Sequence, residues 1–217
     1  MQMINQPRII DDIIRTLKEF IPDAEKLNVI DNEDIENISS LIFNDLIARV
    51  SQDPVALNDE YIYKISRSFK IIFYYRIAHY LFNIEADDLY YKYCAFQISE
   101  YATSITAIEI HPQAKIGKSF VIDHGVNTLI GATSEIGDNC TILQNVVLGA
   151  RKITYNENVK RHPTVGNNVH ISGGVRILGP IKVGNNVSIG PDCLIAEDIA
   201  DNTIIRLKKV QLITKTV

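Results

Sequence analysis

His124 is the residue of this chain whose surroundings best suit proton-transfer chemistry. It lies in the stretch Ile122-Asp123-His124-Gly125, next to an interruption in a regular aliphatic repeat. Glu109 precedes it by fifteen residues, about the length of one turn of a repetitive coil. A carboxylate beside an imidazole fixes its tautomer and stabilises the imidazolium, so the pair could form a general base with its orienting partner. The same spacing fits two unrelated surface side chains equally well.

The other four histidines are weaker candidates. His79 falls within an apolar helical stripe and is expected to be structural. His111 and His162 each precede a proline near a break in the repeat. His170 lies between two apolar residues, at an outward position of the repeat, and is expected on the surface.

The positions of these residues follow from a six-residue period that begins after Glu109. Aliphatic residues occur at Ile110, Ile116, Ile122, Ile130, Ile136, Ile142, Leu148, Val165, Ile171, Ile177, Val183, Ile189 and Ile195. Such repeats are typical of a parallel β-helix, in which each short strand turns a corner and its aliphatic side chain points inward. Cys140 and Cys193 occupy the second inward position of the repeat and are predicted to be inert core residues.

Two interruptions break this period. The interval from Ile122 to Ile130 is eight residues, and that from Leu148 to Val165 is seventeen, which predicts a loop over residues 150–164. A β-helix accepts insertions at its corners, and such loops often carry function.

The N-terminal half has the three- and four-residue apolar spacing of amphipathic helices. Helices are predicted over residues 8–21, 34–50, 61–82 and 87–104, with no glycine among them. The fold class is therefore α+β: an all-helical domain over residues 1–106, a β-helix over 107–200 and a C-terminal tail over 201–217.

Composition limits the classes of function. The chain has 217 residues and a net charge of −4, so no basic surface for nucleic acid is expected. Three widely spaced cysteines and an N-terminus without an apolar signal segment favour the reducing cytoplasm. The most apolar run, residues 69–82, is too short to span a membrane.

The motifs around His124 resemble those of the serine O-acetyltransferase family of hexapeptide-repeat acyltransferases. The resemblance covers roughly residues 50–200, far more than the repeats alone. It is carried by Asp53-Pro54, Tyr75-Arg76-Ile77-Ala78-His79, Glu109-Ile110-His111-Pro112, Ala114-Lys115-Ile116-Gly117, Asp123-His124, Ile142-Leu143-Gln144-Asn145-Val146 with Leu148-Gly149, Arg161-His162-Pro163 and Ile177-Leu178-Gly179.

This resemblance implies a role for each matching residue. His124 would be the general base that takes the proton of the serine hydroxyl, with Glu109 as its carboxylate partner. Asp53 and Asp123 would hold the substrate ammonium, and Arg161 and His162 its carboxylate. The planar fork of an arginine suits a carboxylate physically.

The resemblance further implies a left-handed β-helix that forms a homotrimer, or a dimer of trimers, with each site between two subunits. Acetyl-CoA would be the cosubstrate, lying along a cleft near Ala150, Gly173 and Pro191, and no metal is expected. Family members end in an isoleucine that docks into cysteine synthase. This sequence ends in Thr216-Val217 instead, so the resemblance leaves open whether it binds cysteine synthase.

Several positions depart from the family pattern. Glu109 stands where aspartate is usual, and Asn127 where glycine is common. Residues 151–160 replace a glycine-rich loop with a longer segment that has no glycine. Serine remains the expected acceptor, but a related hydroxy amino acid stays open.

Three alternatives accompany this interpretation. A hexapeptide acyltransferase for a sugar or another hydroxyl acceptor would not need both Asp53 and Arg161, because only a zwitterion requires both charges. A trimeric zinc hydratase would need three convergent histidines, which His111, His124 and His162 could supply in number but not in spacing. A catalytically inactive trimeric scaffold is conceivable because of the change at Glu109.

Overall fold

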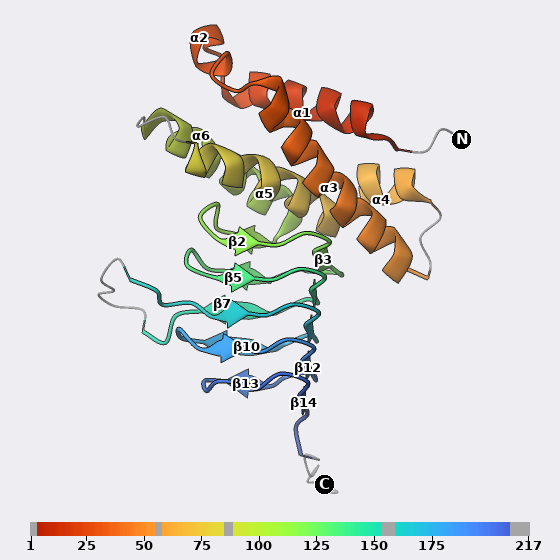
Figure 1. Ribbon diagram of the computed structural model, residues 1–217, viewed down its shortest axis with the longest axis vertical. Helices are drawn as coiled ribbons and strands as arrows, with labels where there is room; N and C mark the ends of the chain where they lie inside the picture. Colours follow the sequence, from red (N-terminus) through yellow and green to blue (C-terminus); the bar gives the residue numbers. More distant parts are fainter. Residues whose placement is uncertain (1–3, 55–57, 85–88, 153–158, 209–217) are drawn as a thin grey trace, which may run out of the picture.

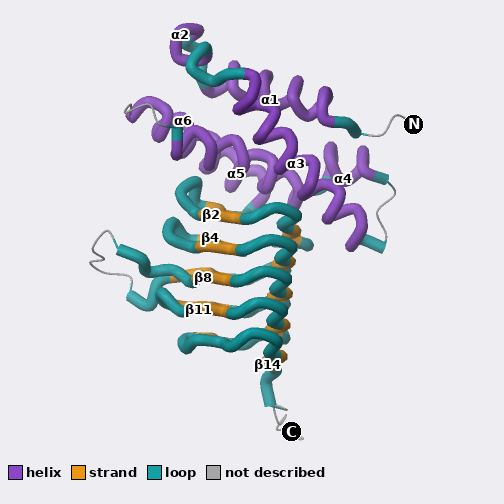
Figure 2. The backbone as a smooth tube through the Cα atoms, viewed as in Figure 1, coloured by secondary structure: helices purple, strands orange, loops and turns teal. Residues whose placement is uncertain are grey.

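The helices stack on one end of a triangular β-helix, so the two halves of the sequence form two parts of one elongated molecule (Figure 1). The computed structural model describes residues 4–54, 58–84, 89–152 and 159–208. Figure 2 shows the change from helix to short strands along the long axis. None of the helices within these ranges is long and apolar enough to cross a membrane.

Local sequence signals explain where the helices begin. The helices are α1 (Gln6–Phe20), α2 (Ala24–Leu27), α3 (Asn32–Gln52), α4 (Asp59–Ile65), α5 (Arg67–Asn83) and α6 (Leu89–Thr106). The Asn5 side chain caps α1, and Asp31 and Asp34 form a reciprocal capping box at the start of α3.

The prediction of a single helix over residues 61–82 is wrong. Ser66 adopts an extended ψ of 117° and separates α4 from α5. Across this break the rings of Tyr63 and Phe69 pack with their centroids 5.8 Å apart. The apolar spacing runs on through the break, which is why periodicity alone did not reveal it. The four-residue α2, capped by Asp23, was likewise too short to produce a periodic signal.

The predicted period of six is confirmed, because every aliphatic position lies in its own strand. The strands are β1 (Glu109–Ile110), β2 (Lys115–Ile116), β3 (Val121–Ile122), β4 (Leu129–Ile130), β5 (Glu135–Ile136), β6 (Thr141–Ile142), β7 (Val147–Gly149), β8 (Thr164–Val165), β9 (His170–Ile171), β10 (Arg176–Leu178), β11 (Lys182–Val183), β12 (Ser188–Ile189), β13 (Leu194–Ile195) and β14 (Ile204–Ile205).

Three parallel sheets form the faces of this left-handed β-helix. The first face has the order β1-β4-β7-β10-β13, the second β2-β5-β8-β11 and the third β3-β6-β9-β12-β14. β14 lies beyond residue 200 and pairs with β12, so the β-helix continues into the segment predicted as a tail. The chain turns a corner between faces, and both interruptions of the period lie at such corners.

The inward residues form a continuous core with the helices above. Ile110, Ile130, Leu148 and Ile177 are at most 1% exposed, and the core extends to Tyr75 on α5. Cys140 and Cys193 are buried here, as predicted. Asn127 has a φ of 60°, and asparagine tolerates this left-handed conformation, which accounts for its replacing a glycine.

Candidate active site

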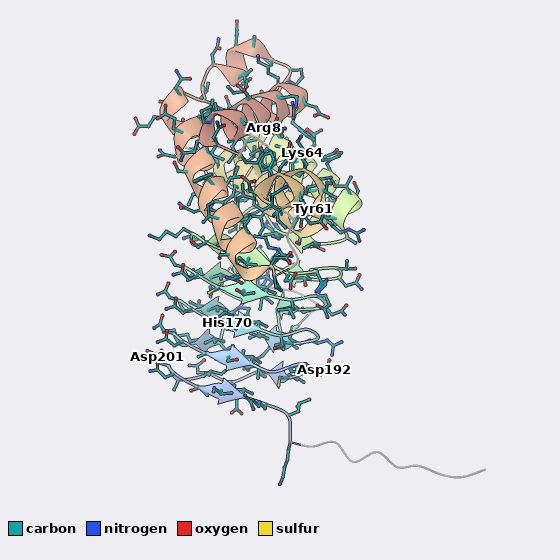
Figure 3. The ribbon with its side chains drawn as sticks, turned by 90° about the vertical axis from the view of Figure 1, so that its right-hand side faces the viewer. Arg8, Tyr61, Lys64, His170, Asp192 and Asp201 are labelled. Atoms are coloured by element: carbon teal, nitrogen blue, oxygen red, sulfur yellow. The ribbon has the colours of Figure 1, made fainter. Side chains whose placement is uncertain are left out.

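An open pocket lies where the lower end of α3 meets the first coil of the β-helix. Its volume is about 580 Å³. The lining comes from the end of α3, from α4 with the break after it, and from the corner after β3: Arg49, Asp53, Pro54, Tyr61, Ile65, Ser66, Arg67, Ser68, Asp123, His124 and Val126. Figure 3 shows Tyr61 on the helical side, directly above the coils. Three predicted site residues, Asp53, Asp123 and His124, thus share one pocket.

His124 projects from the corner that contains the two-residue insertion. Its φ is 59°, in the left-handed region that few residues other than glycine adopt. The next residue must be glycine, because a Cβ on Gly125 would lie 2.4 Å from Ile122. The His124 side chain is 75% exposed, with Nε2 4.0 Å from Oδ2 of Asp123. The corner thus presents an accessible imidazole to the pocket.

Arg49 is a pocket residue that the sequence interpretation missed. Its Nη2 atom lies 2.9 Å from Oδ2 of Asp53 and 2.8 Å from Oδ1 of Asp123. The i,i+4 spacing from Asp53 on one helix could have revealed the first contact. The second joins residues 74 positions apart, and no local pattern reports it.

Glu109 lies beside the corner that carries His124, but the structure gives no bond between them. The Glu109 backbone N–H donates to the Thr128 carbonyl at 2.9 Å, at the end of the same corner. The strand register places Glu109 opposite Leu129, so this coil is twenty residues long, longer than the spacing to His124. Within the described residues no hydrogen bond or ion pair connects the Glu109 carboxylate with the imidazole. Their pairing stays a prediction.

Arg161 and His162 occupy a different corner of the β-helix. They end the long loop between β7 and β8, and their backbone N–H groups both donate to Thr133 Oγ1 at 3.0 Å. His162 packs so closely that a Cβ on Gly131 would lie 2.2 Å from its Nε2. Neither residue lines the pocket of His124. One chain therefore carries the predicted substrate residues as two groups at separate corners.

The chemical state of His162 follows from its surroundings. Burial, followed by the positive charge of Arg161, lowers the pKa of His162 to about 4. Its Nδ1 accepts the backbone N–H of Thr133 at 3.1 Å, so the proton of the neutral ring is on Nε2. At neutral pH this side chain offers an N–H donor, and the positive charge of this corner comes from Arg161.

The residues predicted to contact coenzyme A divide between the same two corners. Gly173 and Pro191 lie on the edge that carries His124, two and three coils further along, where the Asp192 N–H donates to the Gly173 carbonyl at 3.0 Å. Ala150 follows β7 at the corner of Arg161. Of the loop that replaces the glycine-rich segment, residues 153–158 lie outside the described ranges. Arg151 donates to the carbonyls of Leu178 and Ala196.

His170 and His111 differ in their surroundings. His170 lies exposed on the outer face of β9, as predicted (Figure 3). His111 packs against the rings of Phe82 and Phe96, with centroids 6.0 and 5.4 Å away. Within the described ranges no three histidine, cysteine, aspartate or glutamate side chains are grouped to hold a metal ion.

Known proteins resemble the chain over both of its parts. The bacterial transferase hexapeptide pattern of six repeats matches residues 162–197. A serine acetyltransferase of Helicobacter pylori is 37% identical over 166 residues, which cover 76% of this chain and 92% of that protein. One from Staphylococcus aureus is 41% identical over 149 residues, covering 68% and 66%.

A solved structure extends the similarity to the helices. Serine acetyltransferase isoform 3 of Entamoeba histolytica, determined in complex with cysteine, is 33% identical and superposes with a TM-score of 0.78. The match covers 95% of this chain and 72% of that one. With the pocket, the corner histidine and the hexapeptide coils, these similarities show that the chain belongs to the serine acetyltransferase family.

Proposed function

We propose that the chain transfers the acetyl group of acetyl-CoA to the hydroxyl of L-serine, which gives O-acetyl-L-serine and free coenzyme A. The observation that carries this proposal is the pocket that an accessible His124 lines together with the carboxylates of Asp53 and Asp123. An acid pair suits an ammonium group, and an imidazole suits a hydroxyl that must lose its proton. Family membership supplies the reaction class.

His124 acts as the general base. It takes the hydroxyl proton while the serine oxygen attacks the thioester carbon. The tetrahedral adduct then collapses, the carbon–sulfur bond breaks, and the departing sulfur receives the proton from the imidazolium. Glu109 would stabilise that imidazolium, because its strand begins at the end of the corner that carries His124.

The two corners together bind the acceptor. Asp53 and Asp123 hold the ammonium, and Arg161 with the N–H of His162 holds the carboxylate. Because these groups occupy different corners of one chain, a complete site requires the second corner from a neighbouring copy. A homotrimer supplies it by threefold symmetry, and two trimers can pair through their helical ends.

Acetyl-CoA lies between the same two edges. Gly173 and Pro191 continue the edge below His124, and Ala150 belongs to the facing edge of the neighbour. Gly173 has no side chain, which allows the pantetheine arm to approach the backbone closely. The partnership with cysteine synthase is not part of the proposal, since Val217 lies outside the described residues.

The decisive experiment follows thiol release from acetyl-CoA in the presence of L-serine, with the product identified by mass spectrometry. Release that depends on L-serine and yields O-acetylserine supports the proposal. Equal or greater activity with a neutral alcohol or a sugar would move the assignment to another hydroxyl acceptor. An absence of release with every acceptor, in a trimer confirmed by light scattering, would indicate an inactive scaffold.

A further inference from the structure

The carboxylates proposed to hold the ammonium already have a cation between them. One nitrogen of Arg49, Nη2, reaches Asp53 at 2.9 Å and Asp123 at 2.8 Å. The side chains of Arg49 and Asp53 are each 9% exposed, and that of Asp123 is 36% exposed. The guanidinium therefore lies with Asp53 at the inner wall of the pocket, and the more exposed Asp123 lies nearer its opening.

A second arginine besides Arg49 joins the helices to the β-helix. Arg76 does this nearby: its Nε donates to Asp45 at 2.8 Å and its Nη1 to the Ile116 carbonyl at 2.6 Å. The buried Nε of Arg49, by contrast, has no hydrogen-bond partner within the described residues. A structural arginine at this depth is normally satisfied on all sides. The hydrogen bonds of Arg49 that the structure gives go to the two acids of the pocket.

Arg49 makes the net charge of the pocket less negative. Among its lining residues, the two negative charges of Asp53 and Asp123 are offset by the positive charges of Arg49 and Arg67. An ammonium that enters must share its carboxylates with a guanidinium that is already bound to them. Interactions between charges at these distances are strong where water is partly excluded.

We propose that Arg49 is a specificity-determining residue, an internal counter-ion that weakens selection for the ammonium group of the acceptor. This inference rests on the proposed function, because it assumes that Asp53 and Asp123 face that group. With Arg49 in place, an acceptor without an ammonium leaves no uncompensated acid pair in the pocket. Discrimination is a difference of two affinities, and Arg49 reduces that difference.

A matched pair of acceptors isolates the effect. 3-Hydroxypropanoate is serine without its amino group, so it keeps the hydroxyl and the carboxylate. In Arg49→Met the apolar side chain preserves length but removes the charge. L-serine then brings its own ammonium to the two carboxylates that have lost the Arg49 cation, whereas 3-hydroxypropanoate brings none. We expect the ratio of kcat/KM for L-serine to that for 3-hydroxypropanoate to rise about tenfold or more.

The experiment measures both acceptors with wild type, Arg49→Met, Arg49→Lys and the remote surface variant Arg15→Met. Arg49→Lys keeps a positive charge and should return the ratio toward the wild-type value, and Arg15→Met should leave it unchanged. If Arg49 only supports the fold, its loss would lower the activities with L-serine and with 3-hydroxypropanoate by the same factor. An unchanged or smaller ratio in Arg49→Met therefore overturns the inference.

Calorimetric titration of the two acceptors, without acetyl-CoA, separates this inference from the proposed function. It reports the ratio of the two binding affinities, which Arg49→Met should raise in the same direction. This ratio can be measured even if the wild type fails to acetylate L-serine, which would refute the proposed function alone. If Arg49→Met does not fold, Arg49→Gln replaces it, since a neutral amide can still donate to one carboxylate. A ratio in Arg49→Gln no higher than that of the wild type would again contradict the proposal.

Discussion

Two arginine–aspartate clusters join the helices to the first coil, and they differ in what surrounds them. In the first, Arg76 and Asp45 are 2% and 0% exposed, and Asp45 also accepts the Phe120 N–H at 2.8 Å. In the second, Arg49 holds two carboxylates at the wall of an open pocket. The first cluster, sealed and satisfied, can only support the fold. The second lies at the wall of an open pocket, where Asp123 is 36% exposed and accessible to a ligand.

The comparison predicts that variants beside the open cluster change the rate, and variants in the sealed cluster change the stability. The largest effect is expected for His124→Ala, which should lower kcat by about two to four orders of magnitude through loss of the general base. The unfolding temperature should stay the same, since the side chain is 75% exposed. Thiol release and circular dichroism measure the two quantities. His170→Ala, another exposed coil histidine, is the control, and more than a tenth of the wild-type rate would refute the role of His124.

Arg76→Met tests the sealed cluster. It leaves the Asp45 carboxylate buried without its cation, so we expect the free energy of unfolding to fall by about 3–5 kcal/mol. Denaturant unfolding of the assembled protein measures this loss. Arg15→Met removes the partner of Asp12 in a surface pair whose arginine is 75% exposed, and it should have little effect. Equal stability of the two variants would show that the sealed cluster does not hold the halves together.

The repeat made most of the fold predictable from the sequence. Each inward aliphatic residue marks a strand, because one position in six must fill the interior of the coil. Glycine and asparagine indicate the corners, since both tolerate the left-handed conformation found at Asn127. The break at Ser66 could not be predicted, because the apolar pattern continues across it while the backbone turns.

The candidate site was predictable only in part. Asp123 and His124 stand at an interruption of the period, where packing does not dictate residue type. The contact between Arg49 and Asp123 depends on how a helix end meets a coil, which no local pattern encodes. Arg161 and His124 lie apart because the three faces follow one another in a fixed order along the chain. The two interruptions of the period therefore lie at different corners.

Arg161→Ala extends the comparison to the second corner. If Arg161 binds the acceptor carboxylate, its loss should weaken L-serine binding by about 2–5 kcal/mol and raise KM for L-serine accordingly. KM for acetyl-CoA should change much less. Steady-state kinetics with both substrates varied would measure this. Arg206→Ala, at an exposed position beyond β14, is the matched control. An equal loss for both substrates would mean that Arg161 does not select the acceptor.

The smallest effect is expected for Glu109→Gln, which tests whether His124 needs a carboxylate partner during the reaction. Glutamine keeps the size of the side chain but cannot stabilise an imidazolium by charge. Such stabilisation acts mainly in the transition state, so kcat should fall by about tenfold while KM for L-serine stays nearly constant.

Glu197→Gln, an exposed carboxylate on the last coil, serves as the control for Glu109→Gln. In the structure the Glu109 backbone is bonded to Thr128 at the corner of His124, and its carboxylate has no bond to the ring. The pair must therefore form during the reaction if it forms at all. A kcat equal to that of the wild type would show that Glu109 is a surface residue and that His124 acts unassisted.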